Sequence, residues 1–205
     1  MADTATDILD AAERLFAANG YGATSIRSIT REAAANVAAV HYHFGSKEEV
    51  LRGVLDRIAV PINRRRRELL DSLDDPSVAD LVEAFVRPDL EILQDLQRRN
   101  RAAARFAGRI YADRSEPMAT ITREQFAAIA ADFVKRLIPR LPHLSADEVW
   151  WRIQRTVAVI VDFFSGYPEK GLSPDETEET IRRLVIYLTA AMEAPSPKGA
   201  EPTET

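Results

Sequence analysis

Residues 24–47 constrain the fold of this chain more than any other stretch, because they read as two short helices with a tight connection. Thr24 is a good N-cap for the first helix, and apolar residues follow it at helical spacing. Asn36 is the N-cap candidate for the second helix, which Gly45 ends, and Ser46 begins a capping box for a third. Two helices joined this closely are typical of a helix-turn-helix, whose second helix enters the major groove of DNA.

The charge of this stretch favours contact with an anion. The whole chain carries a net charge of −5, which opposes non-specific binding to DNA. Residues 24–47 nevertheless carry Arg27, Arg31 and Lys47 against the single acid Glu32. The positive charge therefore lies where the groove-facing surface is expected, and the helix N-termini there add backbone donors for phosphates.

Several short motifs in residues 1–55 occur together in one known family. They are the runs ILDAA, NGY, TSIR and YHFGSKE, which begin at Ile8, Asn19, Thr24 and Tyr42. In these motifs the chain resembles the TetR family of transcriptional regulators. The family usually has Gly and then Val in the turn of the motif, where this chain has Ala34 and Ala35. A residue other than glycine costs stability if that turn needs a positive φ, so the effect of the two alanines is an open question.

The resemblance implies DNA contacts at particular residues. Base contacts fall to Arg27, whose guanidinium can pair with a guanine, and to Val37 and Ala38, which offer only apolar contact. His41 would face the groove, and Asn36 lies at the start of the same helix. The residues that match phosphate-holding positions of the family are Tyr42, His43 and Lys47. Because the second helix has few side chains that can form hydrogen bonds with bases, we expect DNA shape to carry part of the specificity.

The rest of the chain predicts only helices. Apolar residues recur at helical spacing, separated by proline, glycine and capping residues, so we expect an all-α fold of about nine helices. The expected domains are a helix-turn-helix DNA-binding domain over residues 1–50, a helical ligand-binding and dimerisation domain over residues 51–195, and a disordered tail over residues 196–205. Pro61 either kinks the helix that follows Ser46 or separates two helices.

Two groups of arginines allow more than one interpretation. Residues 64–67 are four consecutive arginines that point all round a helix. A solvated surface is the preferred interpretation, and a second contact with DNA or another anion is the alternative. Arg101, Arg105 and Arg109 share one helix face, where they either pair with acidic neighbours or bind a carboxylate or phosphate of a ligand.

The domain over residues 51–195 is expected to enclose a pocket for a small-molecule effector between its helices. We select candidate lining residues that bring bulk or polarity to core-facing positions. They are Phe85, Arg105, Arg109, Gln125, Phe126, Phe133, Trp150 and Phe163. An effector that fits only one spacing of the recognition helices would shift the population of molecules away from the DNA-bound state.

The last two helices are expected to form the interface of a homodimer. Residues 156–161 are apolar on all sides of a helix, which suggests that one side packs on the core and another on a partner. In the TetR family, two such helices from each subunit form a four-helix interface. The expected interface residues are Ile153, Val157, Ile160, Val161, Phe164, Ile181, Leu184, Val185 and Leu188. A dimer of this kind would bind a palindromic operator in double-stranded DNA.

Other classes of protein are disfavoured. No nucleophile–base pair, phosphate loop or set of metal ligands is visible, so we expect no enzyme activity, no cofactor and no metal. The chain has no cysteine and no apolar run of membrane-spanning length, so we expect a cytoplasmic protein that does not contact membranes. The remaining alternative to a ligand-responsive repressor is a DNA-binding module that a protein partner controls.

Overall fold

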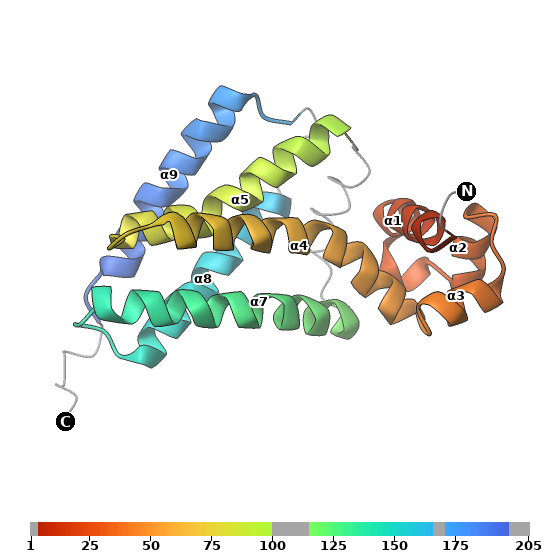
Figure 1. Ribbon diagram of the computed structural model, residues 1–205, viewed down its shortest axis with the longest axis horizontal. Coiled ribbons are helices and arrows are strands. Elements are labelled where there is room, and N and C mark those ends of the chain that lie inside the picture. Colours follow the sequence, from red (N-terminus) through yellow and green to blue (C-terminus); the bar gives the residue numbers. More distant parts are fainter. Residues whose placement is uncertain (1–3, 100–114, 166–170, 197–205) are drawn as a thin grey trace.

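The computed structural model describes residues 4–99, 115–165 and 171–196, which form an all-helical protein (Figure 1). A small helical unit at one end is joined by one long helix to a larger bundle. The described elements are α1 (Thr4–Ala23), α2 (Ile26–Glu32), α3 (Val37–His43), α4 (Lys47–Ser72), α5 (Val78–Arg99), α7 (Glu116–Leu137), a 3₁₀ helix (Ile138–Arg140), α8 (Ala146–Ser165) and α9 (Pro174–Glu193). The prediction of an all-α fold is confirmed. Residues 101, 105 and 109 and the tail from residue 197 onward lie outside the described residues.

The small unit has a core to which α1, α2, α3 and the first turns of α4 all contribute. The buried side chains that fill it include Ile8, Phe16, Ile29, Val40 and Val50. Regular helix stops within α1 at Gly20, whose φ of +80° is outside the helical range but accessible to glycine. The break turns the chain so that α2 packs on α1 and α3 packs on both.

Helix α4 connects the small unit to the bundle without interruption. It continues through Pro61, so the interpretation in which this proline separates two helices is wrong. The expected domain boundary after residue 50 therefore falls inside a continuous helix. Because one helix serves both parts, a displacement of its C-terminal half is passed on to its first turn, which follows the recognition helix.

Arg66 is an exception among the four consecutive arginines. Its side chain is 1% exposed and forms an ion pair with Asp89 of α5, which is equally buried. Arg66 Nε also donates to the carbonyl of Phe85 at 2.9 Å, and its Nη1 donates to Asn63 Oδ1 at 2.8 Å. A buried charge is costly unless it is paired and hydrogen-bonded. The solvated interpretation is thus wrong for Arg66, which instead joins α4 to α5.

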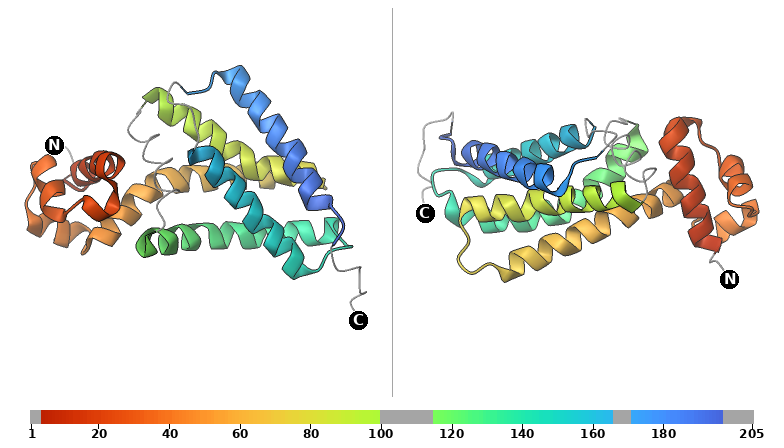
Figure 2. Two further views of the ribbon diagram at one scale, coloured as in Figure 1. Left: turned by 180° about the vertical axis from the view of Figure 1, so that it is seen from behind. Right: turned by 90° about the horizontal axis from the view of Figure 1, so that it is seen from above.

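The bundle consists of α4, α5, α7, α8 and α9 (Figure 2). Helix α5 packs between α4 and α9, and α7 packs on α8 and on the middle of α4. Phe85 of α5 and Phe133 of α7 meet edge to face in the core, with ring centroids 4.5 Å apart. This packing leaves one side of α7 and α8 open to a groove.

Candidate DNA-binding and effector sites

Ser25, not Thr24, is the N-cap of the first helix of the motif. The Ser25 hydroxyl accepts a hydrogen bond from the backbone N–H of Ser28, and the Ser28 hydroxyl accepts one from the backbone N–H of Ser25. Thr24 is buried, and its hydroxyl donates to the carbonyl of Gly20 at 2.9 Å. The predicted cap is wrong by one residue because Thr24 closes the break after α1 instead of starting α2.

The turn between α2 and α3 does need a positive φ, and Ala34 supplies it at +50°. The backbone N–H of Ala35 donates to the Thr30 carbonyl at 2.9 Å, and that of Ala34 donates to the Arg31 carbonyl at 3.4 Å. These two bonds are the pair that ends a helix in a Schellman motif. The helix-turn-helix geometry is therefore retained with alanine, at a cost of roughly 1 to 2 kcal/mol for the left-handed conformation.

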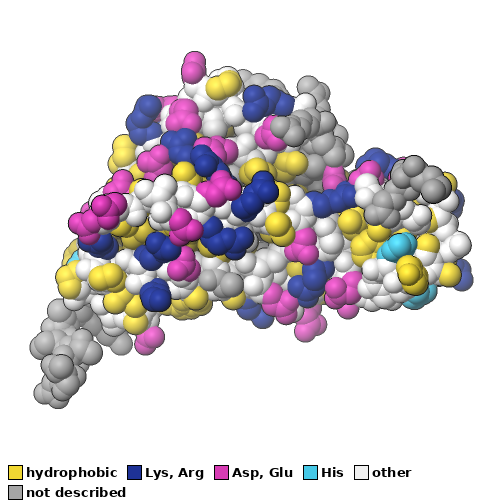
Figure 3. All heavy atoms as spheres, viewed as in Figure 1, with side chains coloured by type: hydrophobic (Ala, Val, Ile, Leu, Met, Phe, Trp, Pro, Cys, Tyr) yellow, Lys and Arg dark blue, Asp and Glu magenta, His cyan; other side chains and the backbone are white. Residues whose placement is uncertain are grey.

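The recognition helix α3 exposes the side chains that the sequence assigns to the groove. Asn36 caps it as predicted, since its Oδ1 accepts from the backbone N–H of Ala39 at 2.7 Å. Val40 is buried, while the exposed residues of α3 are Val37, Ala38, His41, Tyr42 and His43. The Tyr42 side chain is 86% exposed. Figure 3 shows histidine side chains beside hydrophobic ones on the surface of this unit.

Three of these residues, His41, Tyr42 and His43, have rings that contact neighbours within the chain. His41 Nδ1 lies 3.0 Å from the carbonyl oxygen of Gly45, which can only accept, so Nδ1 carries a proton and Nε2 remains for a contact outside the chain. The rings of Tyr42 and His43 meet edge to face with centroids 5.0 Å apart. Both arrangements limit the orientations that these side-chain rings can adopt on the exposed face of α3.

Lys47 has a structural role that the sequence did not reveal. Its ammonium donates to the carbonyls of Tyr21 and Thr24, at 2.8 Å each, and lies 4.0 Å from the centre of the Tyr21 ring. Burial lowers the pKa of the Lys47 ammonium below its usual value. Two of its three donors are thus used to hold the start of α4 against the region between α1 and α2, and the phosphate contact stays a prediction.

The basic surface of the motif is left with little opposing charge. Arg27 and Arg31 are exposed, and neither has an ion-pair partner among the described residues. Glu32, the only acid of residues 24–47, forms an ion pair with Arg14 at 3.3 Å. The two arginines are therefore available to the phosphates of a DNA backbone or to the neutral acceptors of a guanine edge.

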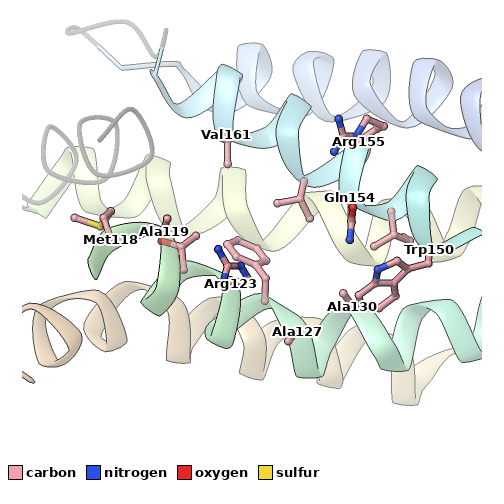
Figure 4. A pocket seen from close by; sticks show the side chains of 13 residues that line it. Met118, Ala119, Arg123, Ala127, Ala130, Trp150, Gln154, Arg155 and Val161 are labelled. Carbon is pink, nitrogen blue, oxygen red and sulfur yellow. The ribbon is translucent and has the colours of Figure 1, made fainter. Parts of the chain in front are cut away.

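A cavity of about 530 Å³ lies between α7 and α8 (Figure 4). Helix α7 contributes Met118, Thr122, Arg123 and Phe126, among others. Helix α8 contributes Trp150, Gln154, Arg155, Val157 and Val161. The volume of the cavity is within the range of small-molecule sites. Phe126 and Trp150 are the two candidate lining residues that the structure places in this cavity.

The other candidate lining residues lie elsewhere. Phe85 and Phe133 are fully buried in the core, where they pack on each other. Gln125 donates to Asp56 Oδ1 of α4 at 2.8 Å, and Phe163 packs on the core without lining the cavity. Arg105 and Arg109 are outside the described residues. These positions were selected for bulk and polarity, which cannot separate a core-facing side chain from one that faces a cavity.

A signal for Arg123 was present in the sequence. No acidic residue stands three or four positions before or after it, so it has no partner on its own helix. Met118, Thr122 and Phe126 follow one another at the same spacing and face the cavity with it. An arginine without an acidic partner, next to a row of apolar side chains on the same helix, indicates a ligand site more specifically than the size of a side chain does.

Four of the expected interface residues lie in the chain's own core. Ile153, Ile160, Ile181 and Leu188 are buried, so they cannot present their side chains to a second chain. Leu184 and Val185 are half-buried, Val157 and Val161 line the cavity, and the side chain of Phe164 is outside the described residues. The exposed large apolar side chains of these helices are Trp150 and Trp151 on α8 and Ile186 and Tyr187 on α9. Because α8 is apolar on all sides, periodicity did not show which side faces the core.

The described residues hold no group of three His, Asp or Glu side chains placed to bind a metal ion. None of the described helices is both long enough and apolar enough to cross a membrane.

Comparison with known proteins identifies the family. Residues 8–54 match the family model of bacterial regulatory proteins of the tetR family, and residues 83–191 match that of a tetracyclin repressor-like C-terminal domain. Over 62 residues the chain is 40% identical to the HTH-type transcriptional repressor Rv3405c of Mycobacterium tuberculosis, which covers 30% of this chain and 33% of that protein. Over 76 residues it is 34% identical to the HTH-type transcriptional repressor NicS of Pseudomonas putida, covering 37% and 36%. The matches thus span about a third of the length of these curated relatives.

Solved structures share the fold. GusR of Salmonella enterica superposes with a TM-score of 0.64 at 21% identity, covering 93% of this chain and 96% of that one. The fatty acid degradation regulator FadR of Bacillus halodurans has a TM-score of 0.66 at 12% identity, covering 94% and 97%. The two family models match residues 8–54 and 83–191, so the chain belongs to the TetR family. It is therefore a DNA-binding transcriptional regulator with a helix-turn-helix, and members of this family are not enzymes.

Proposed function

We propose that the chain represses transcription by binding a palindromic operator as a homodimer, and that a small molecule in the cavity between α7 and α8 releases it. In this proposal residues 1–50 bind DNA and residues 51–195 bind the effector and the second subunit. The observation that carries the proposal is a set of contacts between α7, which forms one wall of the cavity, and α4, which leads to the recognition helix.

Three consecutive residues of α7 make these contacts. Glu124 pairs with Arg52 at 2.9 Å, and Gln125 donates to Asp56 at 2.8 Å. Phe126 lines the cavity with one part of its side chain, and its ring centre is 5.8 Å from the guanidinium carbon of Arg66. A ligand that displaces Phe126 would therefore disturb α7 where it is attached to α4.

The magnitudes indicate which contact matters most. An exposed pair such as Arg52–Glu124 contributes only about 0.2 to 1 kcal/mol. A buried pair such as Arg66–Asp89 costs about 3 to 5 kcal/mol when one partner is removed. Allosteric coupling is typically about 1 to 3 kcal/mol, so a small change in the surroundings of Arg66 is large enough to alter DNA affinity. Phe126 is the residue that touches both the cavity and this pair.

Two further observations support the finer parts of the proposal. The exposed apolar side chains of α8 and α9 offer a surface for a second subunit, as described above. Rv3405c and NicS are named transcriptional repressors, which supports repression as the direction of regulation.

The experiment that tests the proposal is selection of bound sequences from random double-stranded DNA by the purified full chain. We expect a palindromic consensus whose half-sites are about 34 to 36 Å apart, or somewhat more. The Arg27→Ala variant should lose base preference at one position of each half-site, while Arg67→Ala, an exposed arginine of α4, should return the same consensus. Absence of any enrichment would contradict specific DNA binding. If the selection gives a palindrome but no small molecule weakens DNA binding, the result would favour the alternative in which a protein partner controls the chain.

A further inference from the structure

The cavity between α7 and α8 has a lining of one charge sign. None of its described lining residues is acidic, whereas Arg123 and Arg155 are both among them. Its other polar side chains are Thr122 and Gln154. In Figure 4 the guanidinium of Arg123 lies between the two helices, while Arg155 stands at the α8 edge. The cavity therefore favours a negatively charged group over a positively charged one.

Unpaired arginines are uncommon in the described parts of this chain. Most arginines there form ion pairs with carboxylates, including Arg66 in the core and Arg183 on an exposed face. Those with described side chains and no such partner are Arg27, Arg31, Arg67, Arg123 and Arg155. The first two lie on the basic surface of the helix-turn-helix. The last two line the cavity, and neither is neutralised by a described carboxylate, since the guanidinium carbon of Arg155 lies 5.5 Å from the centre of the uncharged Trp151 ring. Both positive charges therefore remain for an anion.

The remainder of the lining is apolar and elongated. In Figure 4 Met118 stands at one end of the cavity and Trp150 at the other, and Phe126 is a further aromatic lining residue. Apolar and aromatic walls with few polar groups are typical of sites for organic molecules. A cavity of about 530 Å³ is within the size range of sites for small organic molecules.

We propose that the effector is an amphipathic organic anion, whose carboxylate or similar group pairs with Arg123 and whose apolar body lies along Phe126 toward Trp150. Arg155 adds a second positive charge at the α8 edge. Guanidinium and carboxylate form two parallel, charge-assisted hydrogen bonds, which give both orientation and affinity. This inference rests on the proposed function, because it assigns a ligand class to the same effector site.

The test is calorimetric titration of the full chain with three compounds that differ only in their head group. They are 6-phenylhexanoate, 6-phenylhexan-1-ol and 6-phenylhexylammonium. We expect the carboxylate to bind about ten-fold more tightly than the alcohol, and the ammonium to bind most weakly. Arg123→Gln should reduce the preference for the carboxylate, and the double variant with Arg155→Gln should abolish it. Arg67→Gln, which removes another exposed and unpaired arginine, should leave it unchanged.

Three results would overturn the inference. They are equal or tighter binding of the alcohol or the ammonium, absence of binding by all three compounds, and a preference for the carboxylate that survives in the double variant. The titration contains no DNA, so it reports only on the ligand class. Release of operator DNA by the carboxylate is measured separately, and a bound carboxylate that leaves DNA affinity unchanged would contradict the regulatory role of the cavity without touching the ligand class.

Discussion

Ala34 adopts a backbone conformation that alanine rarely takes. Its φ of +50° is imposed by the turn of the helix-turn-helix, and glycine takes it without the steric cost of a Cβ. We expect Ala34→Gly to raise the free energy of unfolding by about 1 kcal/mol, which corresponds to a rise in Tm of roughly 2 to 4 °C. Thermal unfolding followed by circular dichroism measures this change.

Ala35→Gly is the matched control for that prediction. Ala35 follows Ala34 directly, but its φ is not positive, so glycine brings it no relief and adds entropy to the unfolded chain. We expect this variant to be neutral or slightly less stable. Equal shifts for the two glycine variants would show that the strain at Ala34 is not what limits stability.

At the scale of single residues, the sequence predicts most of the signals that begin and end the helices of the helix-turn-helix, and it is wrong about one N-cap. Asn36 and Gly45 are local signals, and both act where they were predicted to act. Thr24 and Ser25 are both good capping residues, and local preference cannot choose between them. Here the Thr24 hydroxyl instead donates to the carbonyl of Gly20, at the break within α1, and Ser25 is left to cap α2.

The pair of Arg66 and Asp89 is a buried attachment between two elements, α4 and α5. Removing one partner leaves the other charge buried alone, whereas removing both leaves an apolar contact. We therefore expect Arg66→Met to lower the free energy of unfolding by about 3 to 5 kcal/mol, and the double variant with Asp89→Leu to recover most of that loss. Urea denaturation of the wild type, both single variants and the double variant gives the coupling energy directly.

Additive losses in the double variant would contradict this account of the pair. Arg64→Met serves as the control, because Arg64 is exposed and its ion pair with Glu68 at 3.8 Å contributes little. The sequence could not have singled out Arg66 among its three neighbours. Its burial depends on Asp89, 23 positions further along the chain. Arg66 also donates to the carbonyl of Phe85, in the turn of α5 that precedes Asp89.

At the scale of the whole molecule, exposed apolar side chains gather in two places. Among the described residues, the exposed large hydrophobic side chains are Val37, Tyr42, Val60, Ile138, Trp150, Trp151, Ile186 and Tyr187. Two belong to the recognition helix α3 and four belong to α8 and α9. Exposed apolar patches are typical of sites of interaction with another macromolecule. The sequence placed a subunit interface on α8 and α9, but Ile153, Ile160 and Ile181 lie on sides of those helices that face the core.

The exposed apolar side chains of α9 allow a sharper test of the proposed homodimer. Ile186 is 67% exposed and Tyr187 62% exposed, so a charge placed there is solvated in the single chain and disturbs only an association. We expect Ile186→Glu to remain folded and to have the mass of one chain by light scattering.

Val60→Glu is the control, because Val60 is also exposed and apolar but lies on α4, and this variant should keep the mass of two chains. Ile160→Glu would instead destabilise the single chain, because that side chain is buried. A two-chain mass for Ile186→Glu would place the interface elsewhere. If the mass halves, affinity for the palindrome should fall steeply while affinity for a single half-site stays the same, because the recognition surface on α3 is untouched and only the link between two copies is lost.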